Sequence, residues 1–177
     1  MTLEERARRI RLLVLDVDGV LTDGSINISG NGELFKSFNV RDGLGIRLLQ
    51  KIGVEVAILT GRTSTIVAER ARELGIEHVL QGQRYKVPAY EDLLARLGIS
   101  DNEVAYMGDD LWCLVLRRHC CSRRHHHRWD SRRCGPSPAE CCTTPGGHGA
   151  VRALAELIVK SRGGWDALVR DVFYEGR

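Results

Sequence analysis

The chain has 177 residues, which is long enough for one domain, 1–177, with a sizeable buried core. No apolar run is long enough to span a bilayer, and the first residues lack the apolar core of a signal peptide, so we expect a cytoplasmic protein with no membrane contact. The net charge of +3 does not indicate nucleic-acid binding, because residues 117–144 contribute +5 through seven arginines and two acidic residues and lack the interleaved aromatic residues of a base-stacking surface.

The first half of the chain predicts a helix, a strand, a hairpin, a helix and a strand. In that order the elements are Glu4–Ile10, Arg11–Leu15, Ser25–Ser29 with Glu33–Asn39, Asp42–Lys51 and Val54–Leu59. The turn Gly30-Asn31-Gly32 joins the two hairpin strands. Asp42 is predicted to cap its own helix, which stops at Gly53. The continuous apolar run that follows Gly53 is typical of a buried parallel strand.

The second half predicts helices that alternate with short strands. A helix begins at Thr63 or Ser64 and ends at Gly75, where glycine suits the left-handed cap. The later elements are a strand, a helix, a strand and two helices: His78–Leu80, Val87–Leu97, Val104–Met107, Ala150–Ser161 and Trp165–Phe173. This order predicts an α/β fold with a doubly wound, Rossmann-like parallel sheet and a protruding β-hairpin.

Acidic and hydroxyl residues directly follow three strands of the predicted parallel sheet. Asp16 and Asp18 come after the first strand, Thr60 after the second and Asp109 after the fourth. Ligands of doubly wound sheets bind beyond the carboxyl ends of the strands, so these residues point to one site. Two carboxylates one residue apart repel each other unless a cation compensates, and Mg²⁺ prefers such hard oxygen ligands.

Each of these residues also has a structural interpretation. Asp16 alone could be a turn residue, and Thr60 could belong to an ordinary strand exit. Asp109 and Asp110 could cap a following helix, and Lys86 could be an exposed helix residue. Their occurrence together, in order, favours the functional interpretation.

The nonapeptide Asp16–Gly24, DVDGVLTDG, resembles the first motif of the haloacid-dehalogenase superfamily of aspartate-nucleophile phosphatases. Within this superfamily, the chain resembles the phosphatases of 2-keto-3-deoxy sugar acid phosphates. Further matching segments follow in the family's order: Phe38–Gly43, Leu59–Arg62, Gln81–Gln83, Lys86, Tyr106–Leu111 and Gly146–Arg152. An ordered set of this kind is much more specific than one Asp-x-Asp pair.

The resemblance implies a role for each acidic residue. Asp16 would be the nucleophile that attacks phosphorus, and Asp18 would be the general acid and then the general base. The implied ligands of Mg²⁺ are a side-chain oxygen of Asp16, the backbone carbonyl of Asp18 and the carboxylate of Asp109.

Other positions that match the family are implied to bind the substrate. Thr60 would bind a phosphoryl oxygen, Lys86 would offset the carboxylates, and Asp110 would orient Lys86 or the metal-bound waters. Further substrate contacts are implied for Asp18, Asn39, Val40, Arg41, Asp42, Gly43, Arg47, Gly61, Arg62 and Arg70. Arginine suits the carboxylate of a 2-keto acid, although Arg70 could equally be a solvated helix residue.

The implied reaction is Mg²⁺-dependent hydrolysis of a phosphorylated eight-carbon sugar acid, a lipopolysaccharide precursor, through an aspartyl-phosphate. A nine-carbon acid such as a nonulosonate or N-acylneuraminate 9-phosphate is an alternative substrate. A catalytically impaired scaffold is a further alternative, because Cys113 stands where the family pattern has an aspartate.

The spacing leaves no room for a cap domain. Asp16 and Thr60 are 44 positions apart, and Thr60 and Lys86 are 26 apart, which is too short for a folded lid in either interval. The resemblance implies a homotetramer in which the hairpin covers a neighbour's site, and Ser25–Asn39 has apolar residues for such a contact. The alternative is a hairpin packed on its own domain.

Residues 112–144 do not fit the family pattern. They contain all six cysteines, and between 117 and 144 there is no Val, Ile, Leu, Met, Phe or Tyr. The cysteine and histidine spacings match no common zinc template, and disulfides are disfavoured in a cytoplasmic chain. We favour two compensating frame shifts in the coding sequence over a metal-binding insert. In either case too little apolar area is available to order the segment, so we expect it to be irregular.

Overall fold

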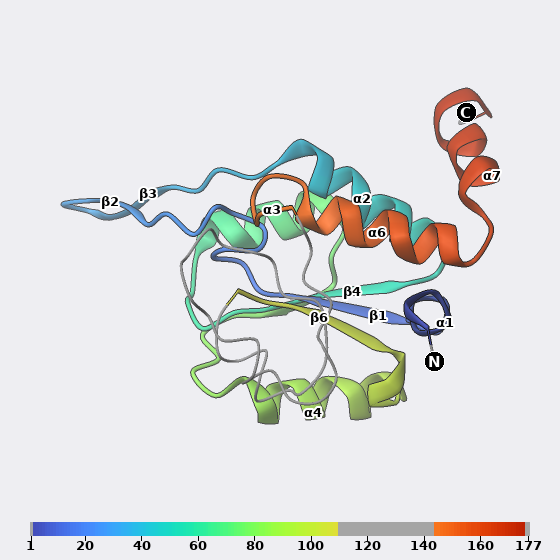
Figure 1. The fold of residues 1–177 in the computed structure, drawn as a ribbon. Helices are drawn as coiled ribbons and strands as arrows, with labels where there is room; N and C mark the ends of the chain where they lie inside the picture. The colour runs from blue at the N-terminus through green and yellow to red at the C-terminus, as the bar shows by residue number, and fades with distance from the viewer. Residues whose placement is uncertain (1, 110–143, 176–177) are drawn as a thin grey trace.

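The structure is a computed structural model that describes residues 2–109 and 144–175. Its centre is a four-stranded parallel sheet in the order β5-β4-β1-β6 (Figure 1). The strands are β1 (Leu12–Leu15), β4 (Glu55–Leu59), β5 (His78–Leu80) and β6 (Val104–Met107). The chain adds β4 and β5 on one side of β1 and then returns to add β6 on the other. The strand order therefore reverses at β1, as in a doubly wound sheet.

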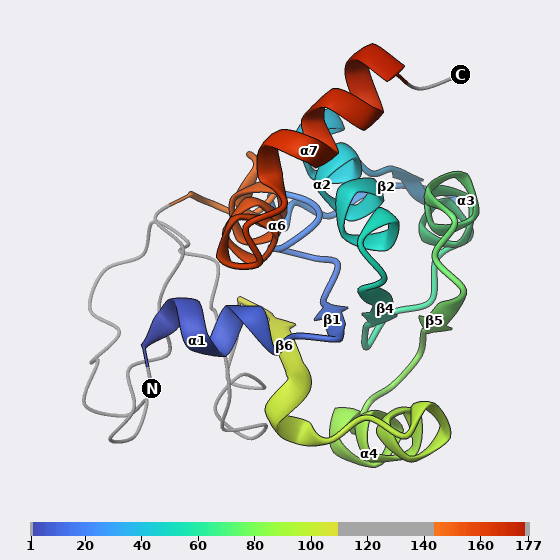
Figure 2. The same ribbon diagram turned by 90° about the vertical axis from the view of Figure 1, so that its right-hand side faces the viewer.

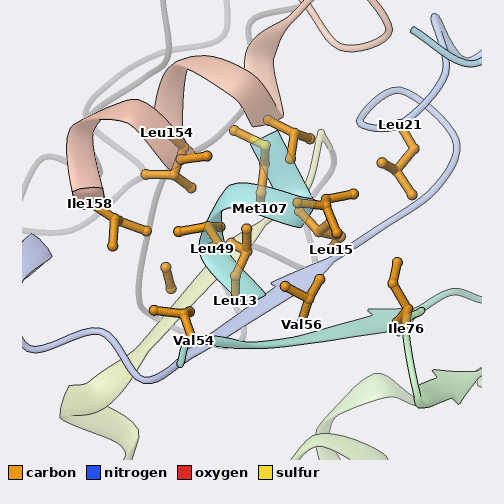
Figure 3. Close-up of a cluster of buried hydrophobic side chains, with 14 of the residues drawn as sticks. Leu13, Leu15, Leu21, Leu49, Val54, Val56, Ile76, Met107, Leu154 and Ile158 are labelled. Carbon is orange, nitrogen blue, oxygen red and sulfur yellow. The ribbon is translucent and has the colours of Figure 1, made fainter. Parts of the chain in front are cut away.

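Helices cover both faces of this sheet (Figures 1 and 2). One face is covered by α2 (Val40–Lys51), α3 (Thr65–Leu74) and α6 (Ala150–Ser161), and the other by α4 (Lys86–Leu97). Alternate residues of β1 serve the two faces: Leu13 and Leu15 pack with the first group, whereas Leu12 and Val14 pack with α4. Figure 3 shows the larger cluster, where Leu13 and Leu15 lie among side chains of α2 and α6.

The remaining helices are short. They are α1 (Leu3–Arg8), a 3-10 turn (Asp101–Glu103), α7 (Trp165–Arg170) and a π-helical turn (Asp171–Glu175). The π-helical turn replaces the end of the single helix that the sequence predicted over Trp165–Phe173. No helix in the described part of the chain has the length and apolar character needed to cross a membrane.

The predicted fold class is confirmed, and most element bounds agree within a residue or two. Ser64 caps α3 by accepting a hydrogen bond from the Val67 N–H at 3.3 Å, and Gly75 ends the same helix with a φ of 67°. One local prediction is wrong. Asn39, not Asp42, caps α2, because its Oδ1 accepts from the Arg41 N–H at 2.9 Å and the helix begins earlier, at Val40.

Asp42 instead caps a distant helix. Its side chain is buried, and its two oxygens accept the N–H groups of Gly149 at 3.2 Å and Arg152 at 2.9 Å, at the start of α6. These donors have no partner within their own helix, and the N-cap position of α6, Gly149, has no side chain to serve them. A residue of α2 therefore holds the first turn of α6 in place.

Burial raises the pKa of the Asp42 carboxyl above its ordinary value of 3.8, against the lowering effect of the backbone N–H donors. A raised folded-state pKa means that the contribution of Asp42 to stability is fully present below the unfolded value and is lost as pH rises through the folded one. Relative to the variant Asp42→Asn, the parent chain should lose about 1.4 kcal/mol of unfolding free energy per unit of raised pKa between about pH 4 and about pH 7.

Urea unfolding of both chains at the two pH values measures this difference. Asp92→Asn is the matched control for the substitution itself, because Asp92 pairs with Arg96 on the exposed side of α4. If the difference in unfolding free energy between the parent and Asp42→Asn is the same at both pH values, the raised pKa of Asp42 is contradicted.

The hairpin leaves the body of the molecule (Figure 1). Its strands, β2 (Asn27–Ser29) and β3 (Gly32–Phe35), pair antiparallel and are shorter than predicted. Its apolar side chains are largely exposed, for example Ile28 at 68% and Leu34 at 59%. The protruding hairpin is thus confirmed, and the alternative of a hairpin packed on its own domain is not what the structure shows. Residues 2–109 and 144–175 contain no separately folded cap, as predicted.

Candidate active site

Asp16 directly follows β1, beside the point where the strand order reverses. Its N–H donates to the Met107 carbonyl of β6 at 2.9 Å, which extends the parallel ladder by one residue. Its Oδ1 accepts the N–H of Val17 at 2.8 Å, and only 12% of the side chain is exposed. A carboxylate this deeply buried requires a counter-charge.

Lys86 supplies that charge. It begins α4, its side chain is 4% exposed, and its ammonium group donates to the other carboxylate oxygen of Asp16, Oδ2. The same Nζ lies 3.4 Å from the Tyr106 hydroxyl of β6. The structure therefore brings together two predicted site residues that are 70 positions apart, and adds a tyrosine that the sequence analysis missed. Tyr106 lies in the matching segment Tyr106–Leu111, but the sequence analysis gave it no role at the site.

Thr60 lies at the end of β4 and is buried. Its N–H donates to the Leu80 carbonyl, and its own carbonyl accepts the N–H of Gln83, both at 3.0 Å. The side chain of Gln81 accepts the Ser64 N–H at 2.7 Å. The loops after β4 and β5 are thereby joined by hydrogen bonds, which place Thr60 on a rigid support.

Asp18 lies two residues beyond Asp16, and its carboxylate is partly exposed. Oδ1 accepts a hydrogen bond from the Lys36 ammonium group at 2.6 Å, and the Arg62 Nε lies 3.7 Å from Oδ2. Arg62 was predicted from the sequence. Lys36 was not, because the sequence placed it in the predicted hairpin strand Glu33–Asn39, where a lysine is usually solvated.

Asp109 approaches the same loop from β6. Gly19 has a φ of 80°, and a Cβ placed on it would lie 1.9 Å from Asp109 Oδ2, so the carboxylate packs directly against the backbone of the nonapeptide. Gly146 also packs closely on this loop, because a Cβ placed on it would lie 1.8 Å from the Gly19 carbonyl oxygen. The Gly147 N–H donates to the Val20 carbonyl at 2.9 Å. Side chains at these glycines would push the loops apart.

Several predicted substrate residues contact protein in this structure. Arg47 donates to the Glu73 carbonyl at 2.7 Å, and Arg70 pairs with the Glu73 carboxylate at 2.6 Å. The Arg70 guanidinium also lies over the Phe38 ring, 5.7 Å from its centroid, and against Gly43.

Those predicted residues that cluster around the start of α2 differ in exposure. Asn39 donates to the Gly147 carbonyl at 3.2 Å, while Val40 is largely exposed. Arg41 is exposed, whereas Asp42 is buried against α6. Gly61, which lies apart from this group in the loop after β4, is also exposed. Their roles toward substrate stay predictions.

The donor atoms suit a divalent metal. The predicted ligands are two carboxylates, of Asp16 and Asp109, and the backbone carbonyl of Asp18, all of them hard oxygens. Among the described residues, no group of three or more His, Cys, Asp or Glu side chains is arranged to hold a metal. Two side chains and one carbonyl leave several ligand positions for water, as Mg²⁺ usually requires. The packing of Asp109 against Gly19 brings the second carboxylate to the same loop as the first.

Two predictions fall outside the described residues. Asp110, expected to orient Lys86 or the metal waters, is one of them. The other is the anomalous segment 112–144, of which only Thr144 is described.

Known proteins resemble this chain along most of its length. No protein-family model matches it. It is 41% identical to the 3-deoxy-D-manno-octulosonate 8-phosphate phosphatase KdsC of Escherichia coli strain K12 over 176 residues, which cover 91% of this chain and 85% of the relative.

Solved structures resemble it as well. One is the 3-deoxy-D-manno-octulosonate 8-phosphate phosphatase from Moraxella catarrhalis in complex with magnesium ion, phosphate ion and KDO, with 38% identity and a TM-score of 0.84 over 94% of this chain and 95% of that one. Another is the cobalt-bound deoxy-D-mannose-octulosonate 8-phosphate phosphatase from Haemophilus influenzae, with 34% identity and a TM-score of 0.80 over 89% of this chain and 92% of that one.

Proposed function

Since this chain belongs to the 3-deoxy-D-manno-octulosonate 8-phosphate phosphatase family of the haloacid-dehalogenase superfamily, and is a phosphomonoester hydrolase, we propose that it hydrolyses 3-deoxy-D-manno-octulosonate 8-phosphate to the free sugar acid and phosphate. The observation that supports this most directly is the buried pair of Asp16 and Lys86 at the tip of β1. An ionised carboxylate held at a fixed place, with its charge partly offset, is a suitable nucleophile toward an anionic ester.

Two carboxylates have different roles in the proposed reaction. An oxygen of Asp16 forms a bond to phosphorus while the bond from phosphorus to the sugar oxygen breaks, which leaves an aspartyl-phosphate. Asp18 gives its proton to the departing sugar oxygen, which is a poor leaving group as an alkoxide. Asp18 then takes a proton from the water that attacks phosphorus, so that phosphate leaves and Asp16 is regenerated.

One similar structure holds magnesium and another cobalt, both divalent cations. The hard oxygen donors of this site suit such an ion, and we propose Mg²⁺ held by Asp16, Asp109 and the Asp18 carbonyl. A bound Mg²⁺ supplies charge neutralisation between the anionic ester and the attacking carboxylate. The chain's own part is to fix these oxygens through the Gly19 and Gly146 packing, and to balance Asp16 through Lys86.

The sugar acid requires cationic partners for its carboxylate. Arg62 is half-exposed and lies beside Asp18, so it is the best placed arginine in the described structure to meet a substrate at this site. Arg47 and Arg70 contact Glu73 and would have to leave that residue to reach a ligand. We also propose a homotetramer, in which the exposed apolar hairpin packs on a neighbouring subunit.

A phosphate-release assay tests this function. With Mg²⁺ present, 3-deoxy-D-manno-octulosonate 8-phosphate should be hydrolysed, and a chelator should remove the activity until Mg²⁺ is restored in excess. A nine-carbon sugar acid 9-phosphate and a substituted phenyl phosphate serve as comparison substrates.

The outcomes are distinct. Preference for the nine-carbon ester would replace the proposed substrate but keep the reaction. If a folded and assembled chain releases no phosphate from any ester, the proposed enzymatic function is wrong and the scaffold alternative is favoured.

A further inference from the structure

We propose that Lys36, which pairs with Glu33 and through Glu33 is linked to Ser64, is a positioning residue for Asp18, and that it couples the root of the hairpin to the acid/base carboxylate. This inference rests on the proposed function for the role of Asp18. It goes beyond that function because neither the motifs nor the predicted site contain Lys36, Glu33 or Ser64.

The Lys36 side chain is charged and almost fully buried. Only 2% of it is exposed, although it comes directly after β3 of a hairpin that is otherwise open to solvent. Its ammonium group lies 2.6 Å from Asp18 Oδ1 and 3.1 Å from Glu33 Oε1. Burying a lysine costs roughly several kcal/mol unless its charge is paired, and Asp18 and Glu33 are the two acidic partners that the structure gives it.

Glu33 ties this lysine to the body of the domain. Its other oxygen, Oε2, accepts a hydrogen bond from the Ser64 hydroxyl, and Ser64 is the residue that caps α3. That hydrogen bond, followed by the pairing with Lys36, holds the pKa of the Glu33 carboxyl below its ordinary value and keeps it charged. A continuous polar chain therefore runs from Ser64 at the N-terminus of α3, through Glu33 of β3 and then Lys36, to Asp18.

Asp18 needs such support. Its carboxylate is 22% exposed, and a proton donor must stay within hydrogen-bond reach of the departing oxygen to be effective. Lys36 fixes one oxygen, Oδ1, on the side of the hairpin and leaves Oδ2 toward Arg62 at 3.7 Å. Displacement by about 1 Å can cost on the order of 10² in rate, which is the size of effect that positioning can supply.

The test uses Lys36→Met, with Lys51→Met as its control, since Lys51 makes an exposed ion pair with Asp171. A series of substituted phenyl phosphates with leaving phenols of increasing pKa reports the need for a general acid without any contact to a sugar. In Lys36→Met, kcat/KM should fall about tenfold or more for the least acidic phenol and about threefold or less for the most acidic one. Lys36→Arg should recover part of the loss.

If Lys36 had only a structural role, its replacement would lower kcat/KM by the same factor for every phenyl phosphate. Parallel plots of log kcat/KM for Lys36→Met and the parent chain would therefore overturn the positioning role. Glu33→Gln keeps the shape of the side chain. It should change the slope of log kcat/KM against the pKa of the leaving phenol in the same direction as Lys36→Met, but by a smaller amount.

Coupling is reciprocal, so it can be measured without turnover. Asp18→Asn should speed hydrogen exchange of the hairpin amides of residues 27–35 by about threefold, the effect of losing one ion pair of moderate strength. Unchanged exchange would overturn the coupling. If the parent chain releases no phosphate from any ester, the proposed function fails while this exchange measurement still decides the coupling.

Discussion

Replacing Asp16 by asparagine is expected to reduce phosphate release by on the order of 10⁴ or more, as removal of a nucleophile does in other enzymes. The amide of asparagine has nearly the same shape as the carboxylate but cannot form the bond to phosphorus. It also leaves Lys86 without its counter-charge, so a loss of stability of about 1–3 kcal/mol should accompany the loss of turnover. Steady-state phosphate release and urea unfolding measure the two effects.

The control for this variant is Asp92→Asn, the same substitution on the exposed side of α4. It should keep parental activity and stability within about 0.5 kcal/mol. When turnover of an ester radiolabelled in its phosphate is quenched with acid, the parent protein should retain label and Asp16→Asn should retain none. Turnover of Asp16→Asn above a hundredth of the parent would remove the nucleophile assignment.

The parts of the fold that could be predicted are those fixed by local pattern. The strands His78–Leu80 and Val104–Met107 and the helix Ala150–Ser161 have the predicted bounds, because turn residues, capping residues and apolar periodicity mark their ends in the sequence itself. The β-α-β-α order then sufficed for the sheet, since parallel strands joined by helices have few possible arrangements.

Contacts between distant segments could not be predicted in this way. Asp42 has the usual position of a helix cap, and nothing local shows that its oxygens bind Gly149 and Arg152, more than 100 positions away. Gly146 is similar. Its sequence neighbourhood suggests a turn, whereas its actual constraint is the Gly19 carbonyl oxygen.

The site residues likewise include some that could be predicted from the sequence and one that could not. Asp16, Thr60 and Asp109 could be placed together because the carboxyl ends of parallel strands meet at one edge. Lys86 and Arg62 came from the family motifs, and the structure puts both beside nonapeptide carboxylates. Lys36 was missed because a lysine beside an exposed hairpin is usually solvated, and only the three-dimensional arrangement shows that it is buried between Asp18 and Glu33.

Replacing Lys86 by methionine should reduce turnover by about 10² to 10³, because it removes a preorganised positive charge from beside the proposed nucleophile. It should also lower the unfolding free energy by roughly 3–5 kcal/mol, the cost of leaving a buried carboxylate without its partner. Unfolding is best measured in chelator, where no cation can replace the lost charge. Lys51→Met, on the surface, should cost less than about 1 kcal/mol.

The double variant Asp16→Asn with Lys86→Met distinguishes a true ion pair from two independent buried residues. Once both charges are gone neither is left unpaired, so the double variant should be more stable than the sum of the two single losses by about 1–3 kcal/mol. Activity should not recover with stability, because the proposed nucleophile is absent. Strictly additive losses of unfolding free energy would show that Asp16 and Lys86 do not stabilise each other, and Lys86 would then need another explanation for its burial.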